Sequence, residues 1–176
     1  MKIRMLAVAV VGASLTFGAS GLAATSPPPK QVTIKQSGGY EFKANRYIKD
    51  KLRWNRDVYD VRSGGTLTVL ANIVDAGPHT FTVVKRRDLP TSFDCKVCEE
   101  LGMAHGANPE SEDPPAFTFL EDGVGSEAPP KINKPGDSAF VAPKQRQNLK
   151  VTAPKGSNLH FVCLVHPWMQ AKVRVG

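Results

Sequence analysis

The stretch FVCLVHPWM, residues 161–169, places a thiol, an imidazole and a thioether within seven positions. Cys163, His166 and Met169 follow an apolar run, with two residues between each successive pair. Sulfur and imidazole donors favour copper over harder metals. These three do not complete a site, and His79, in the stretch AGPHTF (residues 76–81), supplies a second imidazole. We therefore predict a copper site formed by His79, Cys163, His166 and Met169, with the thioether as a weak axial ligand.

This pattern resembles the ligand set of the cupredoxins, the type 1 blue copper proteins of the plastocyanin and amicyanin kind. The resemblance covers two blocks, residues 63–84 and 139–176. It implies one type 1 copper ion and a role as a one-electron carrier. It also implies that electrons enter and leave through an exposed edge of the His166 ring. The chain departs from many family members at Gln170 and Ala171, where they carry glycine after the methionine.

Short alternating segments separated by Gly and Pro turns predict the fold. Because successive side chains of a strand point to opposite faces, His79 ends a core-facing column in residues 79–84. Cys163 ends a similar column that begins at Leu159, which leaves His160 on the opposite face as a surface histidine. Similar alternation marks residues 31–35, 66–72, 138–142, 149–151 and 171–175. We predict an all-β fold, a Greek-key β-sandwich of the cupredoxin type with a long loop insertion.

Residues 40–61 mix aromatic with basic side chains and have no regular period. We expect one short helix or turn in this segment, followed by a strand at residues 58–61. Basic and aromatic residues in such a segment are typical of a solvated sheet edge with buried anchors.

Residues 88–135 interrupt the strand pattern and hold seven of the 14 prolines and ten of the 16 acidic residues. We interpret them as an acidic, Pro-rich insertion between strands of the sandwich. Within the insertion, residues 92–103 are compatible with a short helix that is capped by Ser92 and ended at Gly102.

The pair Cys95 and Cys98 lies on one face of that expected helix and has three interpretations. In an oxidising compartment the two thiols form a disulfide. Alternatively, they form a second Cu(I) site together with Met103 or His105, or a thioredoxin-like redox pair. The spacing alone does not choose among these. If they pair, Cys163 remains unpaired, which a copper-bound thiolate explains.

The N-terminus predicts export. Lys2 and Arg4 precede an apolar run at residues 6–17, and small residues follow at 21–24. We interpret residues 1–24 as a signal peptide rather than an uncleaved anchor, residues 25–30 as a Pro-rich tether and residues 31–176 as the domain. We therefore expect a periplasmic or extracellular protein with no stable membrane insertion after removal of the signal.

Charge and histidine content narrow the possible partners and the class of protein. The insertion carries ten acidic side chains and three lysines, although the whole chain has a net charge of +7. A basic body favours an acidic redox protein as partner, and no recognition motif indicates nucleic acid. Four histidines are too few for the second copper cluster of a multicopper oxidase, so we expect an electron carrier and not an enzyme. We also expect a monomer. The alternatives are a copper storage or delivery protein that also uses Cys95 and Cys98, and an interaction module without metal.

Overall fold

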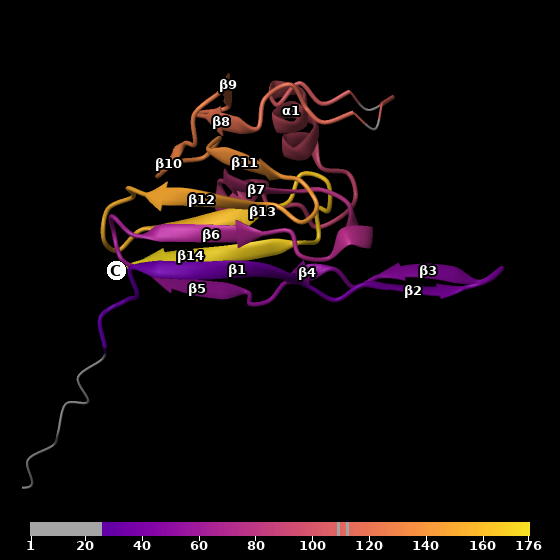
Figure 1. The fold of residues 1–176 in the computed structure, drawn as a ribbon, viewed down its shortest axis with the longest axis horizontal. Coiled ribbons are helices and arrows are strands. Elements are labelled where there is room, and N and C mark those ends of the chain that lie inside the picture. Colours follow the sequence, from indigo (N-terminus) through magenta and orange to yellow (C-terminus); the bar gives the residue numbers. More distant parts are fainter. Residues whose placement is uncertain (1–25, 109, 112) are drawn as a thin grey trace, which may run out of the picture.

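The computed structural model describes residues 26–108, 110–111 and 113–176. The predicted signal peptide, residues 1–24, lies outside the described residues. Two large sheets face each other across a single apolar core, so the predicted all-β sandwich is confirmed (Figure 1). Among the described residues, no helix has the length and apolar character needed to cross a bilayer.

Strands far apart in the chain are neighbours in each sheet. The smaller sheet has the order β10 (Lys131–Ile132), β12 (Arg146–Val151), β6 (Thr66–Leu70), β1 (Gln31–Ser37) and β4 (Arg53–Trp54). The larger sheet has the order β5 (Val58–Val61), β14 (Gln170–Val175), β13 (Asn158–Val162), β7 (His79–Val84), β11 (Ser138–Val141), β8 (Phe119–Glu121) and β9 (Val124–Ser126). The chain therefore crosses between the sheets seven times, after β4, β5, β6, β9, β10, β11 and β12.

The core side of β7 and β13 follows the alternation that the sequence predicts. Phe81 and Phe161 are fully buried and stack with their ring centroids 3.9 Å apart. All six residues of β7 are buried, because the insertion covers the outer face of the larger sheet. There Val84 and Val162 pack with Cys98 in a second, smaller apolar cluster. The insertion thus buries a sheet face that would otherwise be exposed to solvent.

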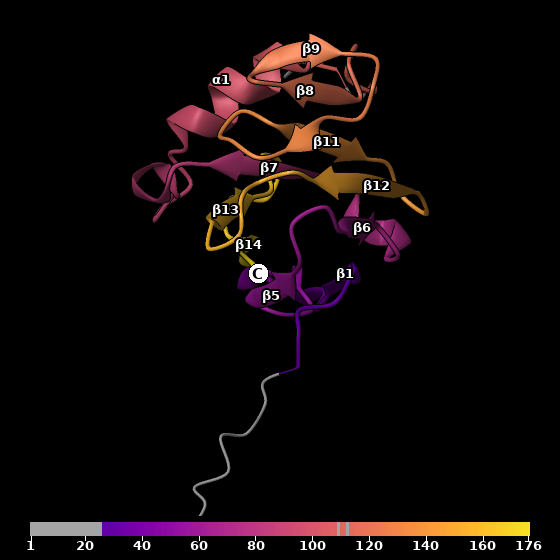
Figure 2. The ribbon, with the colours of Figure 1, turned by 90° about the vertical axis from the view of Figure 1, so that its left-hand side faces the viewer.

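The insertion contributes regular structure to both sheets. β8 and β9 extend the larger sheet beyond β11, and β10 pairs with β12 in the smaller one. Its helix α1 (Lys96–Ala104) lies near β8 and β9 (Figure 2). The predicted Ser92 cap is wrong: Cys95 is the N-cap, and its sulfur accepts a hydrogen bond from the Cys98 N–H at 3.2 Å. The helix also continues beyond Gly102, since glycine lowers helix stability without ending the helix.

Asp137, just before β11, holds the returning end of the insertion against the core. Its carboxylate is fully buried and accepts hydrogen bonds from the backbone N–H groups of Asp122, Asn133 and Lys134. Three donors compensate for the burial of the charge. The Asp137 side chain therefore adds to the strand pairing that fixes the segment between β8 and β11.

Residues 40–61 differ from the expectation. The strand at 58–61 is present as β5, but three further strands replace the expected short helix or turn. β2 (Tyr40–Lys43) and β3 (Tyr47–Asp50) form a two-stranded hairpin through a turn at residues 44–46, and β4 follows. The hairpin extends away from the sandwich (Figure 1). Residues 40–43 alternate apolar and polar side chains, but four residues are too few to indicate a strand in a segment that otherwise has no regular period.

Candidate metal centre

Two adjacent strands bring the predicted ligands together. His79 is the first residue of β7, and Cys163 follows the last residue of β13, which pairs antiparallel with β7. The loop after β13 is closed by two backbone hydrogen bonds. The Met169 N–H donates to the His166 carbonyl at 2.8 Å, and the Cys163 N–H donates to the Met169 carbonyl at 3.0 Å. A third hydrogen bond, from the Leu164 N–H to Thr80 Oγ1 at 2.7 Å, holds the ligand loop, residues 163–169, against the start of β7.

The distances fit a shared metal ion. Cys163 Sγ lies 3.6 Å from His79 Nδ1 and 3.7 Å from His166 Nδ1. The three ligand atoms all lie within 4.8 Å of one another, and all three residues are buried. Ligands at roughly 2.1 Å from an ion in a trigonal plane are about 3.6 Å apart. His79, Cys163 and His166 could therefore hold a metal ion with little movement.

Met169 belongs to the same loop and is fully buried in the core cluster that also contains Cys163. Its backbone shapes the loop, as described above. Its role as the fourth, axial ligand stays a prediction.

The electrostatics favour neutral imidazoles. Burial, and then the neighbouring His166, lower the pKa of His79 to about 3. Burial also lowers the pKa of His166, although the carboxylate of Asp50 opposes that shift. Both rings are therefore neutral near pH 7, and a neutral imidazole has a lone pair available for a metal. Burial raises the pKa of the Cys163 thiol, so a metal ion must displace its proton. The Thr80 N–H donates to Cys163 Sγ at 3.3 Å and stabilises the thiolate.

Two residues behind His79 were not predicted as part of the site. Gln36, on β1, is 4% exposed; its side-chain nitrogen contacts His79 Nε2 and its oxygen accepts a hydrogen bond from the Ile73 N–H at 2.7 Å. Trp54 packs edge-on against the same ring at 5.8 Å between centroids. These contacts turn His79 Nδ1 toward Cys163. A signal was present, because an amide at position 36 shares the core-facing side of its strand with Ile34.

We expect Gln36→Leu to weaken copper binding by roughly 10- to 100-fold, the usual effect of removing a hydrogen-bond partner of a ligand. The reason is that His79 Nε2 then lacks a polar partner and the ring is free to turn. The measurement is a competitive copper titration of the purified variant. Gln31→Leu is a matched control on the same strand, because Gln31 is exposed and far from the ring. Equal affinities for the two variants would contradict this role for Gln36.

The outer side of His166 is more covered than the resemblance implied. His166 is 7% exposed, and Trp168 packs edge-on against it at 5.3 Å between centroids. Trp168 is 37% exposed and in turn contacts Phe93 of the insertion, at 5.4 Å between centroids. The exposed edge of the His166 ring that the resemblance implies is therefore small. An indole lies between His166 and the solvent on this side.

The other candidate donors, Cys95, Cys98 and His105, take part in a disulfide or in hydrogen bonds. Cys95 and Cys98 form a disulfide, and Cys163 is a free, buried cysteine. Both ring nitrogens of His105 are hydrogen-bonded, Nδ1 to the Phe117 carbonyl at 2.7 Å and Nε2 to Ser138 Oγ at 2.8 Å. His160 is half-buried rather than fully on the surface. In the disulfide form, the proposed second Cu(I) site therefore lacks its thiolates and its imidazole.

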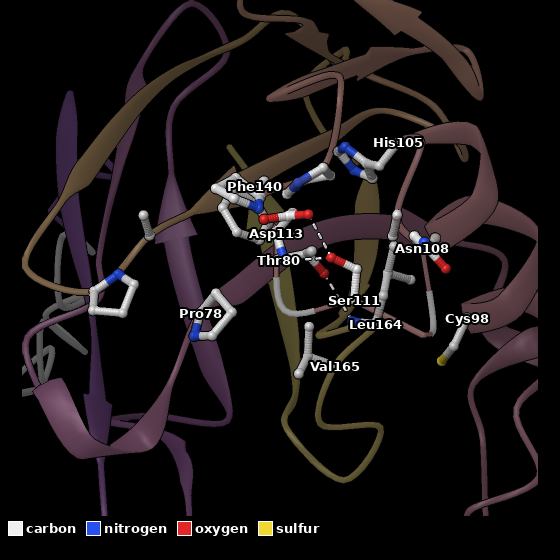
Figure 3. A pocket seen from close by; sticks show the side chains of 16 residues that line it. Pro78, Thr80, Cys98, His105, Asn108, Ser111, Asp113, Phe140, Leu164 and Val165 are labelled. Atoms are coloured by element: carbon white, nitrogen blue, oxygen red, sulfur yellow. Dashed lines mark hydrogen bonds between the residues drawn. The ribbon is translucent and has the colours of Figure 1, made fainter.

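A cleft of about 640 Å³ lies on the flank of the ligand loop (Figure 3). Leu164 and Val165 of the loop line one side, and residues that follow α1, including Ser111 and Asp113, line another. The hydroxyl of Ser111 donates to the Asp113 carboxylate at 2.6 Å. The insertion thus folds back toward the ligand loop on this flank.

Several solved structures resemble this chain in their fold. No protein-family model matches the chain, and no curated protein matches it significantly. A dithionite-reduced auracyanin from Roseiflexus castenholzii is 17% identical, with a TM-score of 0.46 over 85% of this chain and 98% of the other. Auracyanin A, a "blue" copper protein from Chloroflexus aurantiacus, is 16% identical, with a TM-score of 0.42 over 84% and 99%. A purple cupredoxin from Nitrosopumilus maritimus is 11% identical, with a TM-score of 0.41 over 82% and 98%.

Identities this low are not a basis for transferring a function between chains. The features of this chain itself are more specific. It has two facing sheets, a histidine at the start of one inner strand and a Cys-x2-His loop after the neighbouring strand. The fold and the buried group of His79, Cys163 and His166 both fit a cupredoxin.

Proposed function

We propose that the protein is an exported type 1 copper protein that carries single electrons between redox partners. The observation that supports this most strongly is the buried group of two imidazole nitrogens and one cysteine sulfur within 4.8 Å of one another. This donor set, with a weak axial methionine, suits copper. A bound copper ion would supply the exchange between Cu(II) and Cu(I).

The surroundings of the group suit a carrier. His79, Cys163 and Met169 are fully buried, and close packing holds their side chains in place. A ligand set fixed by packing changes little between the two oxidation states of a metal, which keeps electron transfer fast. Thr80 and Gln36 add hydrogen bonds to the sulfur and to the His79 ring. We therefore propose that the chain stabilises one compromise geometry and does not transform a substrate.

Electrons would reach the partner through His166 and Trp168. His166 is the ligand nearest to the solvent, and the Trp168 ring packs against it and is partly exposed. Pro167 and Val165 flank this ring with further apolar surface. We propose that an apolar area on a redox protein contacts Trp168 during transfer, and that the basic body of the chain attracts an acidic partner.

Titration of the purified mature protein with Cu(II) and with Cu(I) tests the function. We expect one tightly held copper per chain, intense visible absorption in the Cu(II) form and reversible bleaching by ascorbate. Several colourless and readily exchanged ions would support storage or delivery instead. A folded protein that takes up no copper would be an interaction module without metal.

We expect Trp168→Glu to slow electron transfer to a protein partner by roughly tenfold or more while leaving the visible spectrum nearly intact. The carboxylate would repel an acidic partner and remove apolar contact area, and the metal ligands would stay in place. Stopped-flow mixing with a reduced redox protein measures the rate. Val124→Glu, on β9, introduces the same charge at a residue that is 69% exposed. If both variants react at the wild-type rate, Trp168 is not on the transfer route.

A further inference from the structure

The hairpin of β2 and β3 presents an apolar face with no layer over it. Phe42 and Ile48 lie directly opposite each other in the hairpin register and are 71% and 73% exposed. Tyr40 lies on the same face and is 50% exposed. Two strands alone cannot cover such a face, and adjacent exposed apolar side chains are typical of interaction surfaces.

The opposite face of the hairpin is polar and internally bonded. The Tyr47 hydroxyl donates to the Glu41 carboxylate at 2.6 Å, and Lys51 forms an ion pair with the same carboxylate. The hairpin therefore has a polar network of side chains on this face. The apolar residues on the other side contribute nothing to that network.

The base of the hairpin is fixed to the body. Gly38 has φ +94°, and an added Cβ there would overlap the carbonyl oxygen of Lys51, so the two strands approach too closely for a side chain. The Lys51 N–H donates to the Gly39 carbonyl at 2.8 Å. Just beyond, Leu52 and Trp54 are buried in the core. The hairpin is thus an arm with an anchored base.

The arm leaves the sandwich at the end that carries the metal centre. Trp54, which follows the arm, contacts the His79 ring. The Asp50 carboxylate at the end of β3 is close enough to His166 to oppose the lowering of its pKa by burial. Figure 1 shows the arm extending beyond this end, away from the C-terminus. A molecule that contacts Trp168 at this end lies within reach of the arm.

The arm also carries a net positive charge, although Glu41 lies opposite Lys49 in the hairpin register. Lys43, Arg46 and Lys49 are exposed, and none of them belongs to a salt bridge within the part of the chain that the structure describes. Arg46 lies in the turn at the tip, and Lys43 and Lys49 lie on the face opposite Phe42 and Ile48, so the arm combines an apolar face with a basic tip and a basic reverse face. Such an arm attracts an acidic surface that has an apolar area. An anionic lipid surface offers the same charge but accepts no electron, so the location of the arm beside the metal centre favours a protein.

We propose that the β2–β3 hairpin is a docking arm for an acidic redox protein. Phe42 and Ile48 contact an apolar area of the partner, and the positive charge of Lys43, Arg46 and Lys49 attracts its carboxylates. The arm and Trp168 together then orient the partner over the metal centre. This inference rests on the proposed electron-carrier function and adds to it the chemistry and the position of the partner.

Two forms of one probe test the proposal. Cytochrome c whose lysines have been succinylated presents carboxylates around its apolar haem edge, and unmodified cytochrome c presents lysines on the same fold. Each is mixed in its reduced form with the Cu(II) form of the mature protein in a stopped-flow instrument, at low and at high salt. We expect the succinylated form to react at least about tenfold faster at low salt, with a difference that shrinks as salt is added.

Two double variants separate the apolar from the charged contribution. We expect Phe42→Ser/Ile48→Ser and Lys43→Gln/Lys49→Gln each to slow oxidation of the succinylated probe by about tenfold, with the larger loss of salt dependence in the second. The matched controls are Val124→Ser on β9 and Arg62→Gln/Lys155→Gln, all of which alter exposed residues. These controls should react as the wild type does. Oxidation of ascorbate should be the same in every variant, because a small reagent does not need the arm.

Each other outcome has a distinct meaning. If the arm variants and the controls oxidise the succinylated probe at equal rates, the arm is not a docking site. If the arm variants instead lose cosedimentation with phosphatidylglycerol vesicles at unchanged cytochrome rates, the arm binds lipid and the proposal is wrong. If the wild type forms no coloured copper species and oxidises neither ascorbate nor cytochrome, the carrier function itself fails.

Discussion

Cys163→Ser abolishes the intense visible absorption of the copper-loaded protein and weakens copper binding by more than about 100-fold. Loss of a hydrogen-bond partner of a ligand weakens binding by at most roughly 100-fold, and loss of a ligand itself costs more. The thiolate is the one sulfur in the group of His79, Cys163 and His166. A hydroxyl at that position is a harder donor and stays protonated, so the copper would keep only the two imidazoles and the weak thioether. Absorption spectroscopy and a competitive titration with Cu(I) measure both effects.

The matching control is Cys95→Ser/Cys98→Ser. These cysteines form a disulfide, so their replacement should leave the colour and the stoichiometry of one copper per chain unchanged. The fold of Cys163→Ser is checked by circular dichroism, because a buried hydroxyl costs roughly 1–3 kcal/mol if it is poorly bonded. A folded Cys163→Ser protein with an intact blue spectrum would contradict the assigned site.

The metal-free protein loses stability as the pH falls below about 6.5. Burial lowers the pKa of His79 to about 3, whereas the unfolded chain has the ordinary histidine value of 6.5. Between these values the unfolded chain binds a proton that the folded chain does not, so the free energy of unfolding decreases with decreasing pH. His79 alone contributes at most about 5 kcal/mol over the window, at about 1.4 kcal/mol per pH unit.

Urea unfolding of metal-free protein at pH 7, 6 and 5 measures this slope. The pKa values of His105 and His166 are lowered by burial too, so we expect the slope to exceed that of a single proton. Addition of copper at about 1,000 times its dissociation constant should raise the stability by about 4 kcal/mol at pH 7. The gain should shrink in acid, where protons compete for the imidazoles. A flat profile from pH 7 to pH 5 would mean that the rings bind protons in the folded state as readily as in the unfolded chain.

The ligands could be predicted from sequence because several independent constraints meet in them. Spacing places Cys163 and His166 on one loop, and alternation places His79 at the core-facing end of a strand. Neither constraint depends on knowing which strands are neighbours. The structure brings these three residues together, while the coordination by Met169 and the cleavage after residue 24 stay predictions.

The residues that support the site were harder to find. Gln36 contacts His79 only because β1 and β7 face each other across the sandwich, and no local pattern reports that pairing. The strands of the β2–β3 hairpin have four residues each, which is too short a stretch for alternation to indicate them clearly. Asp137 resembles any acidic residue near a turn, and its burial follows from three backbone donors that fold back from the insertion.

The strands that residues 88–135 add to both sheets set a limit on how this domain can be shortened. A protein engineer who excised the segment to obtain a minimal domain would remove β8 and β9 from one layer and β10 from the other. Val84 and Val162 would lose their cover, and the carboxylate of Asp137 would lose all three of its donors. The segment is therefore inseparable from the domain, and a graft of the ligand loop onto a shorter scaffold is the safer route to a miniature copper protein.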